Sequence, residues 1–187
     1  AIMYRLVVSL GMECGYYVPN RIIEGYGLNL TRLKQAYAKG YRLLITVDNG
    51  VNAAEALNWA KDNGMKVIVT DHHLYDNPVM CDAFIHPNKL DESQQDFCGA
   101  AVALSLAEYM NKADDKMRIL AMIATLADVV ALKGENVAIV RQGLKLLNQG
   151  CYPNLLAEPL HMRRPLRASD VSYRLVPRLN AAGRLAD

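Results

Sequence analysis

The sequence predicts an α/β fold in which a parallel sheet is flanked by helices. Two apolar runs rich in β-branched residues, at 43–47 and 67–70, each stop at an aspartate, as strands buried on both faces do where they leave a sheet. Between them, alanine and leucine recur at helical spacing over residues 53–60, and Gly64 ends that pattern. A strand, a helix and a strand in this order form a parallel βαβ unit.

The helix between these strands has a recognisable start. Asn52 is followed three residues later by Glu55, which is the spacing of a capping box.

The N-terminal part of the chain adds three elements. The pattern predicts a helix at residues 1–10, a short strand at 16–18 and a helix that runs to Gly40, with Asn29 or Thr31 as its cap.

The sequence after the second long strand is mostly helical. It predicts a short strand at 83–85, a polar loop at 90–97, and helices at 101–110, at 115–127 behind a capping Asp114 and at 137–148 behind a capping Asn136. The stretch PRLNAAGR, at 177–184, has many small side chains and little periodicity, which predicts a loop.

Composition limits the classes of function. With 187 residues and 52% hydrophobic content, the chain suits one globular domain with an ample core. A net charge of +2 gives no strong preference for a polyanion, although six arginines lie at residues 163–184, opposed there only by Asp170. Such a stripe can contact phosphates, but a solvated face with ordinary surface arginines explains it equally well.

Cysteine usage and hydropathy indicate a cytoplasmic protein. The four cysteines show no CxxC pairing, which is typical of free thiols in a reducing compartment. We find no signal-peptide pattern at the start and no apolar run long enough to cross a bilayer, so we expect no membrane partner.

Polar side chains gather at the predicted strand ends. Asp48 follows the first strand, and Asp71, His72 and His73 follow the second. Because ligands of open parallel sheets bind outside the carboxyl ends of the strands, these residues should face one crevice. A single aspartate there is usually a helix cap, but two histidines directly after an aspartate favour a site for a transition metal such as manganese or zinc.

Asp128 is a further candidate. It closes the apolar helical run ATLADVV, where an acid is rarely left unpaired, so it caps a helix or binds metal. Gly25 and Gly27 lack the third glycine of a dinucleotide fingerprint, which argues against that kind of binding.

Five ordered motifs resemble the DHH phosphoesterases, and within that family the bacterial exonucleases specific for single-stranded DNA. They are VPNRIIEGYGLN, TVDNG, VTDHHL, ATLADVVAL and PRLNAAGRL, and together they span nearly the whole chain. The resemblance implies a DHH domain at residues 1–135, followed at 136–187 by a helical connector and an Arg-rich loop that lead toward a second domain.

The resemblance also implies roles for single residues. It implies two-metal phosphodiester hydrolysis with Mn²⁺ or Mg²⁺, Asp48, His72 and Asp128 as metal ligands, Asp71 and His73 as catalytic residues, and Arg21, Arg178, Asn180 and Arg184 as substrate-binding residues. His86 stands where the family more often has asparagine, and we expect it to be structural.

The activity implied is removal of nucleotides from the 5′ end of single-stranded DNA in repair and recombination. A single-strand-binding protein and a helicase are the implied partners. The family's first motif, Asp-x-Asp, does not occur in these residues, so we expect two metal-binding carboxylates to be missing and nuclease activity to be impaired. A phosphoesterase or pyrophosphatase of the same family that acts on small molecules or oligonucleotides is one alternative, and a non-catalytic binding module with this fold is the other.

Overall fold

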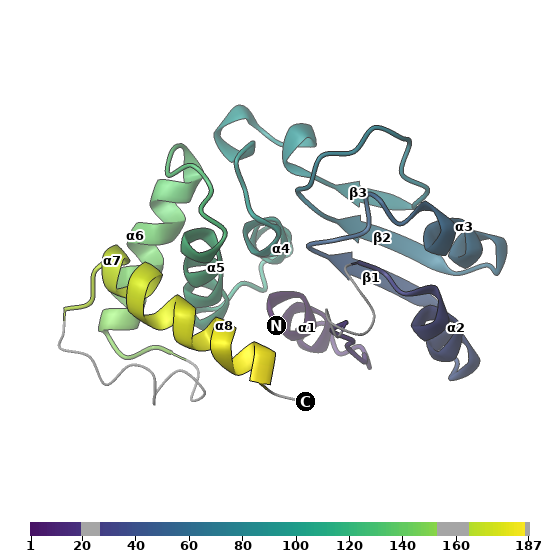
Figure 1. The fold of residues 1–187 in the computed structure, drawn as a ribbon, viewed down its shortest axis with the longest axis horizontal. Coiled ribbons are helices and arrows are strands. Elements are labelled where there is room, and N and C mark those ends of the chain that lie inside the picture. The colour runs from purple at the N-terminus through teal and green to yellow at the C-terminus, as the bar shows by residue number, and fades with distance from the viewer. Residues whose placement is uncertain (20–26, 153–164, 186–187) are drawn as a thin grey trace.

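A parallel sheet of three strands occupies one half of the molecule and a group of helices the other (Figure 1). This computed structural model describes residues 1–19, 27–152 and 165–185. The strands are β1 (Leu43–Val47), β2 (Lys66–Thr70) and β3 (Ala83–Ile85), in the order β1-β2-β3. Both pairings are parallel, so the predicted fold class is confirmed.

One face of the sheet is covered by α2 (Leu30–Ala38) and α3 (Ala54–Asp62), which is the crossover helix of the βαβ unit. Asn29 caps α2 as predicted, because its side-chain oxygen accepts the N–H of Arg32 at 3.1 Å. The core on this face is made of apolar residues from both helices and from the central strand: Leu33, Ala56, Leu57, Ala60, Val67 and Val69.

The opposite face is covered by α1 (Ile2–Ser9) and α4 (Gly99–Tyr109), which lie between the sheet and the remaining helices (Figure 1). Their core joins the buried side of α1 to small residues of α4 and to Ile45 and Val47 of β1. The alanines of α4 let its backbone approach the sheet closely. Two short 3-10 turns, Pro87–Lys89 and Glu92–Gln94, connect β3 to α4.

The helical half contains α5 (Asp115–Ala127), α6 (Glu135–Asn148) and α7 (Ala168–Asp170), followed by a π-helical turn (Val171–Leu175) and α8 (Val176–Leu185). The predicted bounds of α5 are confirmed, and Asp114 caps it by accepting the N–H of Met117 at 2.7 Å. Helices α5 and α6 pack closely at Gly143, where a Cβ atom would overlap the side chain of Met122.

The predicted loop at 177–184 is wrong, because those residues belong to α8. Val171, Leu175 and Leu179 are spaced by four residues and pack on the core of α5 and α6, which favours a helix over an open loop. Pro177 is accommodated because the preceding turn is π-helical, and wide turns of this kind accompany breaks in the regular hydrogen-bond ladder.

Three smaller predictions also fail. Residues 16–18 form no strand, since no neighbouring strand pairs with them in the part of the chain that the structure describes. Ala53 is the N-cap of α3 and Asn52 binds elsewhere. Gly134 is the N-cap of α6, while Asn136 lies in its first turn and donates to the carbonyl of Asp96.

Two predictions about the chain as a whole can be compared with the structure. Among the described residues, no helix combines the length and hydropathy needed to cross a bilayer. All four cysteines are unpaired thiols, and Cys98 is the buried one. The division of the chain at residue 135 stays a prediction.

Candidate metal centre

Asp48 occupies the first position after β1 and turns the chain sharply there. Its φ of 62° lies in the left-handed region, which aspartate tolerates better than most residues. Its N–H still donates to the carbonyl of Thr70, at 3.0 Å, so the turn is held against the end of β2. The carboxylate is therefore fixed at the carboxyl edge of the sheet, as the sequence pattern predicts.

Asp71 is buried and ties the two strand-end loops together. Its side chain is 1% exposed. One carboxylate oxygen accepts the N–H of Val51 at 3.0 Å, and the other accepts the N–H groups of His72 and His73 at 2.8 and 3.2 Å. The loop that carries Asp48 and the loop that carries the histidines thus share one anchor.

The charge state of Asp71 follows from these contacts. Burial raises the pKa of its carboxyl group, but the hydrogen bonds from Val51, from the ring and N–H of His73 and from the N–H of His72 outweigh burial and lower the pKa below its ordinary value. Asp71 is therefore an ionised, fully bonded anchor.

His73 is oriented by this anchor. Its Nδ1 lies 2.7 Å from Asp71 Oδ1, and since that carboxylate only accepts, Nδ1 carries the donated hydrogen. The other ring nitrogen, Nε2, is left for a ligand, and the ring is about half exposed. A carboxylate that fixes a histidine in this way is the usual support of a metal-binding imidazole.

His86 holds the same loop through its backbone. It is buried, and its Nε2 donates to the backbone carbonyl of His73 at 2.9 Å. Its Nδ1 lies 2.8 Å from Asn88 Oδ1 and 3.3 Å from the backbone nitrogen of Asn88. The structural role expected for His86 matches this position.

His72 joins residues from three different segments. Its Nε2 lies 3.1 Å from Asp48 Oδ1 and 3.6 Å from Asp128 Oδ2, and its side chain is 16% exposed. The hydrogen bond to Asp48 raises the pKa of His72, and its partial burial opposes this less strongly. A positive charge is thus favoured where these three side chains meet.

Asp128 reaches the centre from the helical half, because it forms the C-cap of α5. The end of α5 is held to the start of α4 by a buried contact in which Cys98 Sγ and Thr125 Oγ1 are 3.6 Å apart. Gly99, the first residue of α4, lies directly against Asp48, and a Cβ atom at this position would overlap the Asp48 carboxylate. Sequence reasoning missed Gly99, since its importance comes from a neighbour 51 positions away.

The donor set fits a divalent cation. One ligand atom each from Asp48, His72 and His73 lies within 4.8 Å of the others. Two ligands that each lie about 2.1 Å from one ion at a right angle are about 3 Å apart, which matches the 3.1 Å between Asp48 Oδ1 and His72 Nε2. Mixed oxygen and imidazole donors suit manganese or zinc better than calcium.

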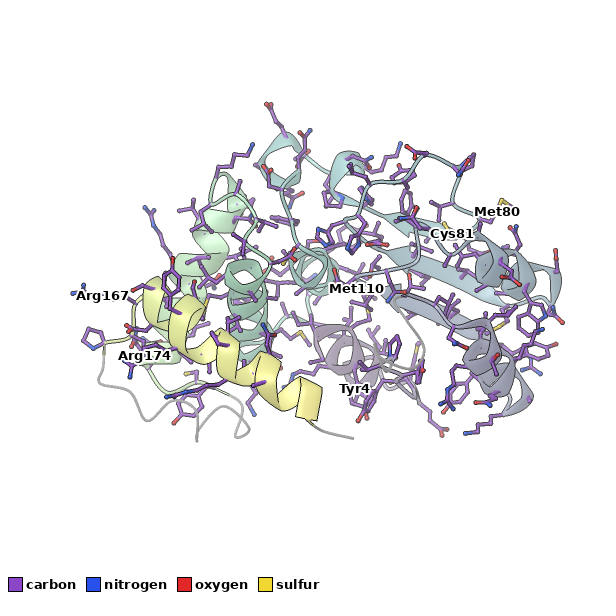
Figure 2. All side chains as sticks on the ribbon, viewed as in Figure 1. Tyr4, Met80, Cys81, Met110, Arg167 and Arg174 are labelled. Atoms are coloured by element: carbon purple, nitrogen blue, oxygen red, sulfur yellow. The ribbon has the colours of Figure 1, made fainter. Side chains whose placement is uncertain are left out.

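The predicted phosphate-binding residues are less well placed by the structure. Arg21 lies outside the described residues. Arg178 and Asn180 are exposed on α8, and the side chain of Arg184 lies outside the described part. Figure 2 shows Arg167 and Arg174 of the basic stripe at the end of the helical half that is remote from the sheet.

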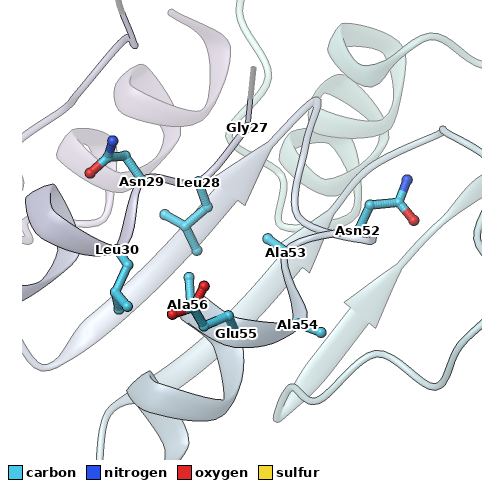
Figure 3. A pocket seen from close by; sticks show the side chains of 9 residues that line it. All are labelled: Gly27, Leu28, Asn29, Leu30, Asn52, Ala53, Ala54, Glu55 and Ala56. Atoms are coloured by element: carbon cyan, nitrogen blue, oxygen red, sulfur yellow. The ribbon is translucent and has the colours of Figure 1, made fainter. Parts of the chain in front are cut away.

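A separate pocket of about 320 Å³ lies between the first turns of α2 and α3 (Figure 3). Glu55 is the only titratable side chain among its described lining residues, which are Gly27, Leu28, Asn29, Leu30, Asn52, Ala53, Ala54, Glu55 and Ala56. One carboxylate among small and amide side chains makes a poor metal site, so the centre around His72 is the better candidate for chemistry.

Comparison with known proteins gives matches along the chain. The model of the DHH family, N-terminal domain, matches residues 1–132. The single-stranded-DNA-specific exonuclease RecJ of Escherichia coli (strain K12) is 37% identical over 203 residues, which cover 96% of this chain and 35% of that protein. RecJ of Bacillus subtilis (strain 168) is 32% identical over 200 residues, 99% of this chain and 24% of that protein. The chain thus spans about a third or less of these curated relatives.

Two solved structures are similar over almost the entire chain. A crystal structure of exonuclease RecJ bound to manganese has a TM-score of 0.82 at 30% identity, covering 100% of this chain and 49% of that one. RecJ from Thermus thermophilus in complex with Mn²⁺ has a TM-score of 0.77 at 29% identity, covering 98% of this chain and 28% of that one.

Proposed function

The chain belongs to the DHH family, and from this premise we propose that it forms part of the catalytic core of a metal-dependent exonuclease that acts on single-stranded DNA from the 5′ end. The observation that carries the proposal is that carboxylate oxygens of both Asp48 and Asp128 lie close to His72 Nε2, at 3.1 and 3.6 Å, beside the carboxyl edge of the sheet. The names of the relatives, single-stranded-DNA-specific exonuclease RecJ, support the choice of substrate. The manganese in the similar structures supports the choice of cofactor.

Asp48, His72 and Asp128 hold a divalent cation, Mn²⁺ or Mg²⁺, in this proposal. A cation held there would supply Lewis-acid chemistry, which activates water for attack and offsets the charge that develops on the phosphate. Asp48 and Asp128 provide the negative charge that keeps the cation in place, and His72 provides a neutral imidazole nitrogen between them.

His73 acts on the substrate. Its Nδ1–H is held by Asp71, so Nε2 is the ring nitrogen left to contact the phosphate or orient the attacking water. Because Asp71 also fixes the N–H groups of both histidines, the ring of His73 keeps its direction without rearrangement during the reaction. Asp71 is thus a positioning residue.

We assign the binding of phosphates further along the DNA to four residues, because of the motifs that contain them: Arg21, Arg178, Asn180 and Arg184. The same resemblance supports a cytoplasmic enzyme of repair and recombination, with a single-strand-binding protein and a helicase as partners. Unpaired cysteines are consistent with a reducing compartment.

Metal binding tests the proposal first. We expect the 187-residue chain to bind about one Mn²⁺ in a calorimetric titration, because its described residues bring one compact donor set together. Asp48→Ala and His72→Ala should weaken binding at least tenfold, with unfolding midpoints in urea close to that of the wild type. Asp62→Ala, which removes an exposed acid from α3, is the control and should bind as the wild type does.

Substrate class is tested next. Binding of 5′-phosphorylated single-stranded DNA should require the metal centre, and Arg178→Ala should flatten its salt dependence by roughly 0.7 in log–log slope if this arginine contacts one phosphate. Release of nucleotides should be slow, since one donor set of this size holds one ion rather than two. Equal hydrolysis of bis-p-nitrophenyl phosphate by wild type and Arg178→Ala, with no binding of DNA by either, would instead indicate a small-molecule phosphoesterase.

A further inference from the structure

Two apolar side chains next to the metal centre are almost fully exposed. Leu74, which follows His73, is 93% exposed, and Val129, which follows Asp128, is 86% exposed. Single exposed apolar residues are common and need no explanation. Here, however, each is joined by one peptide bond to a residue of the centre, and the two belong to the two loops that meet where His72 contacts Asp128.

Val129 has an unfavourable backbone conformation. Its φ is 57°, in the left-handed region, where a β-branched residue is an outlier. It stands directly after the C-cap of α5, a position that helices usually fill with glycine or asparagine. Asn111 fills the corresponding position after α4, with a φ of 54°.

The strain at Val129 is not offset by packing, because its side chain is exposed. Strained residues of this kind concentrate at functional sites. Glycine would fit the backbone better, so what valine adds at this position is an apolar surface that faces outward, beside Asp128.

Leu74 is presented by a loop that is held on both sides. Its carbonyl accepts the side-chain N–H of Asn52 at 3.2 Å, and the carbonyl of His73 just before it accepts from His86 at 2.9 Å. Hydrogen bonds on both sides therefore hold the backbone of Leu74 in a conformation that leaves its side chain exposed.

We propose that Leu74 and Val129 are the two apolar lips of the metal centre and contact the base of the nucleotide whose phosphate is cleaved. This inference rests on the proposed function. A nucleotide in single-stranded DNA combines a charged phosphate with an apolar base face. In this proposal His73 and the cation that the carboxylates would hold bind the phosphate, while the lips bind the face of the base and so distinguish a nucleotide from a simple phosphoester.

The test compares two single strands of equal length in the presence of Mn²⁺. One is a 5′-phosphorylated thymidylate 12-mer with a 3′ fluorophore, and the other is an abasic deoxyribose-phosphate strand with the same labels. Leu74→Ala and Val129→Gly should each weaken binding of the thymidylate strand about fivefold, as expected for part of the burial energy of one apolar side chain. Binding of the abasic strand should change less than twofold, and Mn²⁺ binding should not change.

Matched controls come from the far end of α4, about 15 Å along the helix from Gly99. Tyr109→Ala removes another side chain that is 86% exposed, and Asn111→Gly relaxes another left-handed residue that follows a helix. Both should bind the two strands as the wild type does. Val129→Gly should unfold at the same or a higher urea concentration than the wild type, because backbone strain is removed. If Val129 had only a structural role, a variant of unchanged or higher stability would not bind DNA more weakly.

The outcomes separate the two proposals. If the wild type binds Mn²⁺ but no thymidylate strand, the proposed function fails and this inference fails with it. If the wild type binds the strand and both lip variants bind it equally well, or lose the abasic strand to the same extent, only the inference fails. Loss of a wild-type dimer on Leu74→Ala, seen by light scattering, would assign the lips to self-association and would also overturn the inference.

Discussion

Gly99→Ala tests how the centre is assembled, because it adds a single methyl group at the start of α4. An ideal Cβ atom there would lie 2.6 and 2.7 Å from Cβ and Cγ of Asp48. Carbon atoms do not approach so closely, so one of the two segments has to move. Rotation of the Asp48 side chain alone does not relieve the contact with its Cβ, which is fixed by a backbone in the left-handed region.

The size of the effect follows from opposing contributions. Inserting a methyl group into a tight contact costs about 1–3 kcal/mol, and replacing a helical glycine by alanine returns about 0.4–1 kcal/mol. We therefore expect a net loss of about 1 kcal/mol in the free energy of unfolding, within the range of these opposing contributions. Mn²⁺ affinity should fall more, by about 10–100-fold, the range typical of changes that displace a metal ligand without removing it.

Gly143→Ala provides the matched control, since it makes the same substitution in a helix and produces the same kind of overlap, with Met122. Urea unfolding and calorimetric Mn²⁺ titration of both variants give a simple comparison. Gly143→Ala should lose a similar amount of stability, about 1 kcal/mol, and keep its Mn²⁺ affinity. If Gly99→Ala keeps wild-type Mn²⁺ affinity, or if both variants lose it in parallel with stability, the contact with Asp48 does not position the metal ligand.

Two further predictions concern carboxylates outside the centre. Burial raises the pKa of Asp114, but its bonds to Arg5 at 2.6 Å and to the N–H of Met117 lower it below the ordinary 3.8. The ionised Asp114 therefore contributes its full stabilisation above pH 3.8 and loses it as pH falls through the lowered pKa of the folded state. In urea unfolding from about pH 5 to about pH 2.5, Asp114→Asn should lack this part of the decrease in the free energy of unfolding. Hydrogen bonds, from Lys61 most strongly and then from the N–H of Val67 and from Lys66, lower the pKa of Asp82 to about 2. A carboxyl-carbon NMR titration should give this value, and Lys61→Met should move it toward 3.8; a titration unchanged by Lys61→Met would refute this assignment of the cause.

The strand ends could be predicted because one physical rule places them. Parallel strands present their carboxyl ends on one edge, so Asp48 and His72 had to lie close once both strands were recognised. The structure brings these two side chains to 3.1 Å. Asp71 belongs to the same strand end and could be predicted to lie there, but its bond to Val51 could not be predicted because it depends on how the two loops pack.

The helix at the C-terminal end was harder to predict from local pattern. Residues 177–184 contain Pro177, Gly183 and few apolar side chains, so local propensity favours a loop. Tertiary packing decides otherwise, because Leu175 and Leu179 extend the core of α5 and α6. The spacing of Val171, Leu175 and Leu179 is visible in the sequence and indicates the helix once these residues are taken together with the stretch that follows.

The centre draws its residues from the sheet and from the helical half, and this determines how each responds to change. Asp48 and His72 come from the sheet and share the anchor Asp71, so their separation is set locally. Asp128 comes from α5, whose apolar side packs on α6 and α8. Its distance from His72 therefore depends on the docking of the helical half, through the contact of Cys98 with Thr125. A substitution that displaces the C-terminal end of α5 should thus reach the metal through Asp128 alone and leave the pair of Asp48 and His72 intact.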